Sequence, residues 1–151
     1  MEFYSLKDIR NLSKKISQII KVGNIIFLYG EIGVGKTTFV RFLVNHLEAK
    51  KGIKKSDILS PTFNIVYDYK IGALKIYHYD LYRIKNYKDI LELGMFENAK
   101  KYVTIVEWPE SIKKKPKNRI DIFFQYSKQK DFRKVKLFGL GKWKNYKFNE
   151  V

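Results

Sequence analysis

The sequence predicts an α/β domain of three layers, with helices covering a mixed parallel and antiparallel sheet. The first observation is a continuous apolar run at residues 25–29, which is rich in β-formers and typical of a strand buried on both faces. The second is a pair of amphipathic patterns, at 5–21 and 36–50, that predict helices before and after that strand. The third is a series of later strand-like segments with short connections.

The first helix has recognisable end signals. Ser5 is a suitable N-cap and Asp8 follows three residues later, as in a capping box. Gly23 is expected to end the helix. After the second helix, segments 63–69 and 74–79 lie on either side of Gly72, which predicts an antiparallel hairpin. The remaining expected elements are a short helix at 87–93, a buried strand at 102–106 ended by Pro109, and two alternating strands at 119–124 and 133–138.

The composition suits one compact domain over residues 1–151. With 45% hydrophobic residues, a chain of this length can bury about 68–70% of its unfolded surface. There are no cysteines, which excludes disulfides, thiolate metal sites and cysteine nucleophiles. No apolar run approaches the roughly 20 residues that span a bilayer, so no membrane partner is expected. The first residues do not resemble a signal peptide, and we expect a cytoplasmic protein.

The charge is strongly positive and uneven. The chain carries +16 in total, and residues 111–151 hold 13 basic and 3 acidic residues, a net +10. Such a segment can bind a phosphate backbone. It can equally reflect a chain that uses Lys at most surface positions, and the sequence leaves both interpretations open.

The segment from Gly30 to Thr37, GEIGVGKT, fits the pattern G-x-x-x-x-G-K-[ST]. Glycines allow left-handed backbone angles, and consecutive N–H groups can then surround an anion. The helix that begins at Lys36 adds the positive end of its dipole. The pattern therefore predicts a phosphate-binding loop (P-loop) for a nucleoside triphosphate. Lys36 would reach the β- and γ-phosphates and Thr37 would bind Mg²⁺.

A second metal ligand is expected opposite this loop. In P-loop enzymes an acidic residue at the end of a neighbouring buried strand holds the metal. Glu107 follows the apolar run at 103–106 and would lie at the carboxyl edge of the sheet, where ligands bind in open α/β folds. We therefore predict Thr37 and Glu107 as metal ligands, although a strand-end glutamate can also simply face solvent.

Polar residues cluster at positions 78–83, where the hairpin ends. Asp80 is a candidate to hold Mg²⁺ through water or to orient an attacking water. Arg83 is either a phosphate or carboxylate contact or a surface charge. We expect His78 to be a packed, hydrogen-bonded side chain rather than a base. His46 has no partner that the sequence identifies, and we interpret it as structural.

Two further segments border the predicted site. Residues 60–63 carry hydroxyl groups that could sense the γ-phosphate, as in a switch loop, or could simply form the turn that starts a strand. Trp108, followed by Pro109, either covers the site or packs against the core.

Five motifs together resemble the TsaE (YjeE) family, the bacterial ATPases needed to make threonylcarbamoyladenosine in tRNA. The resemblance covers residues 5–110 well and the basic C-terminal third only loosely. In order along the chain the motifs are Gly30-Glu31-x-Gly33-x-Gly35-Lys36-Thr37-Thr38, Ser60-Pro61-Thr62-Phe63, His78-x-Asp80-Leu81-Tyr82-Arg83, Glu92-Leu93-Gly94 and Val106-Glu107-Trp108-Pro109.

The resemblance implies a P-loop NTPase-type domain that binds ATP and Mg²⁺ and hydrolyses ATP weakly alone. Its implied partners are TsaB and TsaD, of which TsaD transfers the threonylcarbamoyl group to tRNA, and ATP hydrolysis would sustain turnover of the complex. Direct contact with tRNA is left open. The implied catalytic residues are Lys36, Asp80 and Glu107, and Thr62 would lie in the switch-like loop. The implied nucleotide-binding residues are Ser5 (near the adenine), Gly33, Val34, Gly35, Lys36, Thr37 and Thr38. A basic residue at Arg133 or Lys134 could also contact the nucleotide, but the match there is ambiguous.

Two other functions are compatible with the P-loop. A small-molecule kinase would need an acceptor pocket, usually with an Arg-rich lid, whereas only Arg41 and Arg83 lie near the motifs. A nucleic-acid-binding module with a vestigial P-loop would bind RNA with a steep salt dependence and without an effect of ATP. A GTPase is disfavoured because no Asn-Lys-x-Asp motif is present.

Overall fold

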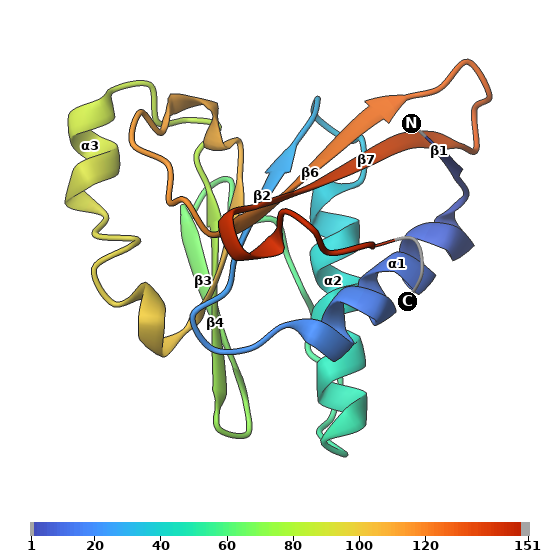
Figure 1. Cartoon of the computed structure of the whole chain (residues 1–151), viewed down its shortest axis with the longest axis horizontal. Helices are drawn as coiled ribbons and strands as arrows, with labels where there is room; N and C mark the ends of the chain where they lie inside the picture. The colour runs from blue at the N-terminus through green and yellow to red at the C-terminus, as the bar shows by residue number, and fades with distance from the viewer. Residues whose placement is uncertain (1, 149–151) are drawn as a thin grey trace.

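A seven-stranded sheet forms the middle layer of the structure, a computed structural model that describes residues 2–148 (Figure 1). The strands are β1 (Glu2–Tyr4), β2 (Ile25–Tyr29), β3 (Val66–Ile71), β4 (Leu74–Asp80), β5 (Val103–Glu107), β6 (Arg119–Tyr126) and β7 (Arg133–Leu140). The helices are α1 (Leu6–Ile19), α2 (Lys36–Lys50) and α3 (Tyr87–Glu92), with three short 3-10 turns η1 (Ala99–Lys101), η2 (Pro109–Ser111) and η3 (Gly141–Trp143). No helix within the described residues combines the length and apolar character that a bilayer crossing requires.

The sheet is mixed, as predicted. Its order is β1-β7-β6-β2-β5-β4-β3, and the four central strands β6, β2, β5 and β4 run parallel. The antiparallel pairs β6–β7, β7–β1 and β3–β4 form the two margins. Because β2, β4 and β5 all run in the same direction, their carboxyl ends meet at one edge, and the loop after β2 meets the last residues of β4 and β5 there.

Strand β2 is buried on both faces, which confirms the interpretation of its continuous apolar run. Ile26 and Leu28 belong to the core beneath α1 and α2, whereas Ile25 and Phe27 belong to the core beneath α3. Figure 1 shows α1 and α2 on one side of the sheet and α3 on the other. The predicted three-layer α/β architecture is therefore confirmed.

The predicted start of α1 is also confirmed in atomic detail. Ser5 is the N-cap, and its Oγ accepts a hydrogen bond from the Asp8 backbone N–H at 3.2 Å. The Ser5 N–H donates in return to the Asp8 carboxylate at 2.8 Å, which completes the capping box. A cap of this kind contributes about 1 kcal/mol. It fixes the direction in which the chain passes from β1 into α1.

The predicted strands need correction at three points. Strand β3 starts at Val66 rather than at Phe63, because residues 61–64 form a turn and Ile65 has a positive φ of 66°. Strand β1 is absent from the predicted elements, and it exists through pairing with β7, more than 120 residues away in sequence. Strand β6 also extends to Tyr126, two residues beyond its predicted end.

Candidate functional site

The loop from Gly30 to Gly35 joins β2 to α2 in a conformation that requires glycine. Gly30, Gly33 and Gly35 have φ values of 142°, 73° and 119°. A Cβ on Gly30 would lie only 2.5 Å from the Phe124 carbonyl oxygen of β6, so the loop runs directly against its neighbouring strand. These angles turn the loop around the N-terminus of α2, where free N–H groups and the helix dipole favour anions.

The Lys36 side chain lies inside this turn. Its Nζ donates hydrogen bonds to the carbonyl oxygens of Gly30 at 2.6 Å and Glu31 at 2.9 Å. The side chain is buried, and burial is the largest effect on its pKa, which is lowered from 10.5. The carboxylates of Glu107, Asp80 and Glu110 act in the opposite direction. The ammonium group is therefore held where it is poorly hydrated and where an anionic ligand would compensate its charge.

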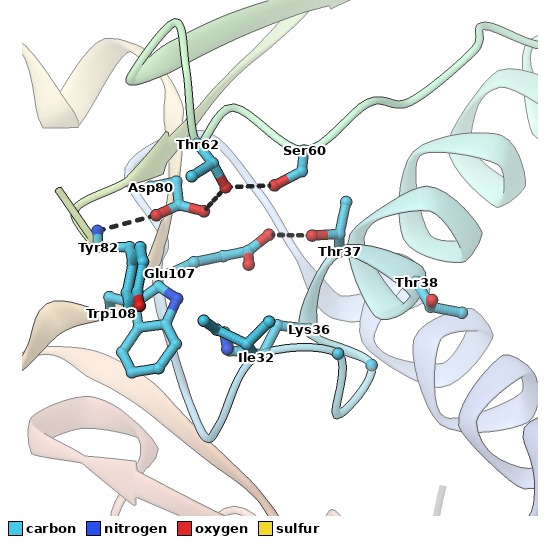
Figure 2. Close-up of a pocket in the computed structure, with 12 residues that line it drawn as sticks. Ile32, Lys36, Thr37, Thr38, Ser60, Thr62, Asp80, Tyr82, Glu107 and Trp108 are labelled. Atoms are coloured by element: carbon cyan, nitrogen blue, oxygen red, sulfur yellow. Dashed lines mark hydrogen bonds between the residues drawn. The ribbon is translucent and has the colours of Figure 1, made fainter.

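Thr37 and Glu107 meet across the cleft. Thr37 Oγ1, in the first turn of α2, donates a hydrogen bond of 2.9 Å to Oε1 of Glu107, the last residue of β5 (Figure 2). Glu107 is only 2% exposed, so it is not a strand-end residue facing solvent. The structure thus brings together the two predicted metal ligands, which are 70 residues apart in sequence.

Asp80, the last residue of β4, lies beside Glu107 in the parallel register. Its Oδ1 accepts a hydrogen bond from the Tyr82 N–H at 2.9 Å, and its Oδ2 accepts one from Thr62 Oγ1 at 2.8 Å. Thr62 in turn lies 2.8 Å from the hydroxyl oxygen of Ser60 (Figure 2). The predicted switch-like loop is therefore linked through Thr62 to a buried carboxylate at the strand ends.

Trp108 covers the site and also packs against the core beneath α3, so it does both of the things that the sequence left open as alternatives. The Trp108 backbone has a positive φ of 57°, unusual for a bulky residue and a source of strain. That conformation brings its ring over Lys36 Nζ, 4.1 Å from the ring centroid, and against the Tyr82 ring. The ring thus shields the ammonium group from water.

These groups line one pocket of about 200 Å³. Its lining residues are Ile32, Gly33, Gly35, Lys36, Thr37, Thr38, Ser60, Thr62, Asp80, Tyr82, Glu107 and Trp108 (Figure 2). Each of the three predicted catalytic residues lies in it. Sequence reasoning did not identify Ile32 or Tyr82 as lining residues, although Tyr82 belongs to the motif at 78–83.

The donor set fits a magnesium–nucleotide complex. Mg²⁺ is normally bound by one or two protein oxygen ligands together with substrate phosphates and water. One hydroxyl and one carboxylate lie 2.9 Å apart here, next to a glycine loop shaped for phosphate. No group of three or more His, Cys, Asp or Glu side chains placed to hold a metal occurs in residues 2–148. The protein would therefore supply part of the coordination and the nucleotide the rest.

A second, smaller groove adjoins the first on the far side of the loop. It is lined by Tyr4, Leu6, Ile9, Val34, Gly35, Thr38, Asp131 and Arg133. Arg133 Nε donates to the Val34 carbonyl at 3.1 Å, and its guanidinium lies over the Tyr126 ring. Ser5 stands between two lining residues, but its hydroxyl binds Asp8 in the helix cap. Its role next to a nucleobase therefore stays a prediction.

Three further side chains that the sequence singled out, those of His78, His46 and Arg83, lie outside the lining of the phosphate pocket. His78 is fully buried and hydrogen-bonded, as predicted. His46 does have a partner, since its Nε2 lies 3.3 Å from the Arg10 carbonyl oxygen, a contact between α1 and α2 that the sequence could not show. Arg83 packs over the Phe63 ring, with 4.0 Å between Cζ and the centroid.

Comparison with known proteins identifies the family. The family model of the threonylcarbamoyl adenosine biosynthesis protein TsaE matches residues 3–135. The chain is 40% identical over 109 residues to the TsaE protein of Rickettsia prowazekii, covering 72% of this chain and 73% of that protein. It is 34% identical over 122 residues to the TsaE protein of Synechocystis, covering 77% and 74%.

A solved structure has the same fold. The crystal structure of YdiB from Bacillus subtilis superposes with a TM-score of 0.74 and 26% sequence identity, covering 95% of this chain and 88% of that one. The shared fold agrees with the observed architecture, whereas the match of the family model over most of the chain and the sequence relatives identify the family. The chain belongs to the TsaE family.

Proposed function

We propose that this chain binds ATP with Mg²⁺ and hydrolyses it, in the cytoplasm, as part of the biosynthesis of threonylcarbamoyladenosine in tRNA. The observation that carries the proposal is the hydrogen bond between Thr37 and Glu107. It joins the P-loop helix to the neighbouring strand end at the point where a metal ligand pair is expected. The named function of the TsaE relatives supports the same pathway.

The chain's own residues supply the binding chemistry. The Lys36 ammonium, which donates to two loop carbonyls, would donate instead to β- and γ-phosphate oxygens. Thr37 and Glu107 would hold Mg²⁺, which would neutralise charge on the transferred phosphate. Asp80, fixed on both oxygens by Thr62 and Tyr82, orients the attacking water. Thr62 thereby connects the reaction to the loop at 60–63.

The adenosine part is assigned to the smaller groove between α1 and the P-loop. Gly35 and Thr38 line both this groove and the phosphate pocket, so a single nucleotide can span them. Leu6 and Ile9 form an apolar wall of this groove that suits a base, and Arg133 places a cation in the same lining. This assignment favours Arg133 over Lys134 as the basic nucleotide contact.

Partner proteins are expected to complete the site. Four large exposed apolar side chains either line the phosphate pocket (Ile32 and Tyr82) or directly neighbour its lining residues in sequence (Leu59 and Phe63). We call them the apolar rim, and their exposed fractions are 62%, 45%, 61% and 78%. Exposed apolar clusters of this kind mark protein-binding surfaces. We propose that TsaB and TsaD, the partners implied by the family resemblance, cover this rim and stimulate hydrolysis.

The test is ATP hydrolysis by the full chain, with and without TsaB and TsaD, over a range of Mg²⁺ concentrations. We expect slow hydrolysis alone and a large stimulation by the partners. The matched variant is Glu107→Gln, which keeps the side-chain size and one acceptor oxygen but removes the charge. It should require at least about tenfold more Mg²⁺ for half-maximal ATP binding.

Three results would count against the proposal. Coincident Mg²⁺ titrations of the parent and Glu107→Gln would show that Glu107 is structural. Transfer of the γ-phosphate to a small acceptor, rather than to water, would favour a kinase. Binding of RNA without any effect of ATP would favour the vestigial P-loop.

A further inference from the structure

His78 is a buried motif residue that the proposed chemistry does not use. It lies in β4, its side chain is fully buried, and it contacts a predicted metal ligand. Nε2 of His78 is 2.8 Å from Oε1 of Glu107, and Nδ1 is 3.2 Å from the hydroxyl oxygen of Tyr69. A buried imidazole with a partner on each nitrogen is held in one orientation.

The sheet register explains how these side chains meet. Tyr69 pairs with Ile76, His78 pairs with Ile105, and Asp80 pairs with Glu107. Tyr69, His78 and Glu107 are therefore diagonal neighbours on three adjacent strands, and diagonal neighbours on one face are within reach of long side chains. Thr37, in α2, donates its hydroxyl to Glu107, the last of the three side chains, and α2 covers the same face of the sheet.

The hydrogen-bond directions follow from the groups involved. A carboxylate only accepts, so Nε2 must carry the hydrogen that is shared with Glu107. Nδ1 can then accept from the Tyr69 hydroxyl. Burial raises the pKa of that hydroxyl, which therefore retains its proton and remains a donor. The Glu107 carboxylate thus selects the tautomer of His78, and the Tyr69 hydroxyl supports that tautomer by donating to the unprotonated Nδ1.

The consequence concerns the two oxygens of Glu107. Oε1 receives hydrogen bonds from both Thr37 and His78. In residues 2–148 no hydrogen bond reaches the other oxygen, Oε2, which is therefore available to a cation. If Thr37 turns its hydroxyl to a metal, His78 still holds Oε1 and keeps the carboxylate from rotating.

We propose that His78 is a positioning residue for the metal site: through the Tyr69–His78–Glu107 chain it fixes the Glu107 carboxylate so that Oε2 faces the Mg²⁺ of a bound nucleotide. The inference rests on the proposed function, because it assigns His78 a role toward the same ion. His78 acts only through Glu107 and contacts neither nucleotide nor metal. Hydrogen-bond partners of metal ligands typically change metal affinity by about 10–100-fold when removed.

The binding experiment measures ATP affinity by calorimetry at a series of free Mg²⁺ concentrations, on the full chain. His78→Phe removes the donor, whereas His78→Gln keeps an amide N–H near the position of Nε2. We expect His78→Phe to raise the Mg²⁺ concentration for half-maximal ATP binding about tenfold or more, with unchanged ATP affinity in EDTA. His78→Gln should restore it to within about threefold of the parent, and Tyr69→Phe should give an intermediate shift.

A second readout needs no metal. Long-range ¹H–¹⁵N NMR of the ring reports which nitrogen carries the hydrogen. The chain has only two histidines, so the variant His46→Gln leaves His78 as the single imidazole. We expect a protonated Nε2 and an unprotonated Nδ1. The variant that also carries Tyr69→Phe should weaken that preference without reversing it, because Glu107 still accepts from Nε2. This arm keeps the inference testable if His78→Phe does not fold.

The outcomes separate the inference from the proposed function. If the parent binds ATP with a clear Mg²⁺ dependence and His78→Phe coincides with it, His78 is structural and only the inference fails. A hydrogen on Nδ1 with none on Nε2 in the parent also overturns it. If the parent shows no Mg²⁺ dependence of ATP binding, the proposed function fails and the inference fails with it.

Discussion

Gly30→Ala tests whether the close approach of the P-loop to β6 sets the geometry of the site. An added Cβ would lie 2.5 Å from the Phe124 carbonyl oxygen and 2.9 Å from Val34 Cγ1. Ordinary contact begins near 3.4 Å, so loop and strand must separate by about 0.9 Å (3.4 − 2.5). One contact atom belongs to the backbone of a central strand, which cannot move as a side chain can.

The energetic cost has two sources. Overpacking costs about 1–3 kcal/mol, and a non-glycine residue at a φ of 142° adds about 1–3 kcal/mol of strain. A central value of about 3–4 kcal/mol corresponds to a melting temperature about 6–16 °C lower for a domain of this size. A displacement near 1 Å at the phosphate loop should also weaken ATP binding or hydrolysis by up to about 10²-fold.

Thermal unfolding followed by circular dichroism, together with ATP titration, provides the assay. Gly52→Ala is the matched control, because Gly52 also has a positive φ, of 66°, but no atom lies within 4 Å of an added Cβ. It should cost only the backbone strain, about 1 kcal/mol, and leave ATP affinity unchanged. Equal shifts in the two variants would refute the close-packing argument. A stable Gly30→Ala protein with parental ATP affinity would refute it as well.

The remaining predictions concern charge and the apolar rim. Lys36→Met should lower ATP affinity at least about tenfold, because it removes a charge-assisted donor, and calorimetry checks this. Burial lowers the pKa of Lys36 below 10.5, so the unfolded chain binds that proton more tightly than the folded chain does. The free energy of unfolding should therefore rise with pH in the window just below 10.5, and Lys36→Met should flatten that rise in thermal unfolding. Asp80→Asn can keep both hydrogen bonds, so we expect parental ATP affinity with hydrolysis slowed about 10²-fold; a rate within twofold of the parent would make Asp80 structural. Phe63→Ser should weaken the stimulation of hydrolysis by the partners. Val22→Ser should not, because Val22 is also an exposed apolar residue but precedes β2, at the sheet edge opposite to the site.

Local patterns in the sequence predict much of this fold. A capping box and apolar periodicity predict α1, apolar periodicity predicts α2, and a continuous apolar run predicts β2, because each of these signals lies within the element itself. The predicted start of β3 is wrong because Ile65, a β-branched residue, gives no sign in the sequence of its positive φ. Strand β1 and the strand order depend on pairing between distant segments, which no local pattern contains.

The same division applies to the site. The P-loop residues are contiguous, so their chemistry could be predicted directly. Glu107 could be predicted only because a P-loop requires an acid at a neighbouring strand end. The contact between His78 and Glu107 could not, because it depends on the register of β4 with β5. The contact of His46 with the Arg10 carbonyl depends in the same way on how α1 packs against α2.

The positions of the buried polar side chains distinguish those that stabilise the fold from those that belong to the site, without reference to any motif. Some of them hold the fold together locally, since Glu48 binds Ser56 at the end of α2, Asn24 receives the Lys21 N–H, and Asp121 pairs with Arg119. Four others, Lys36, His78, Asp80 and Glu107, gather at the carboxyl ends of the central strands.

Burying four such groups together costs free energy that apolar side chains of similar size would not. One hydrogen bond joins two of them, His78 and Glu107, and the others bind backbone groups or Thr62. These bonds offset only part of the cost, since burial still lowers the pKa of Lys36. A bound anion and cation would compensate the remainder. The concentration of poorly hydrated charge at one sheet edge is therefore itself an argument that the pocket is built for a charged ligand.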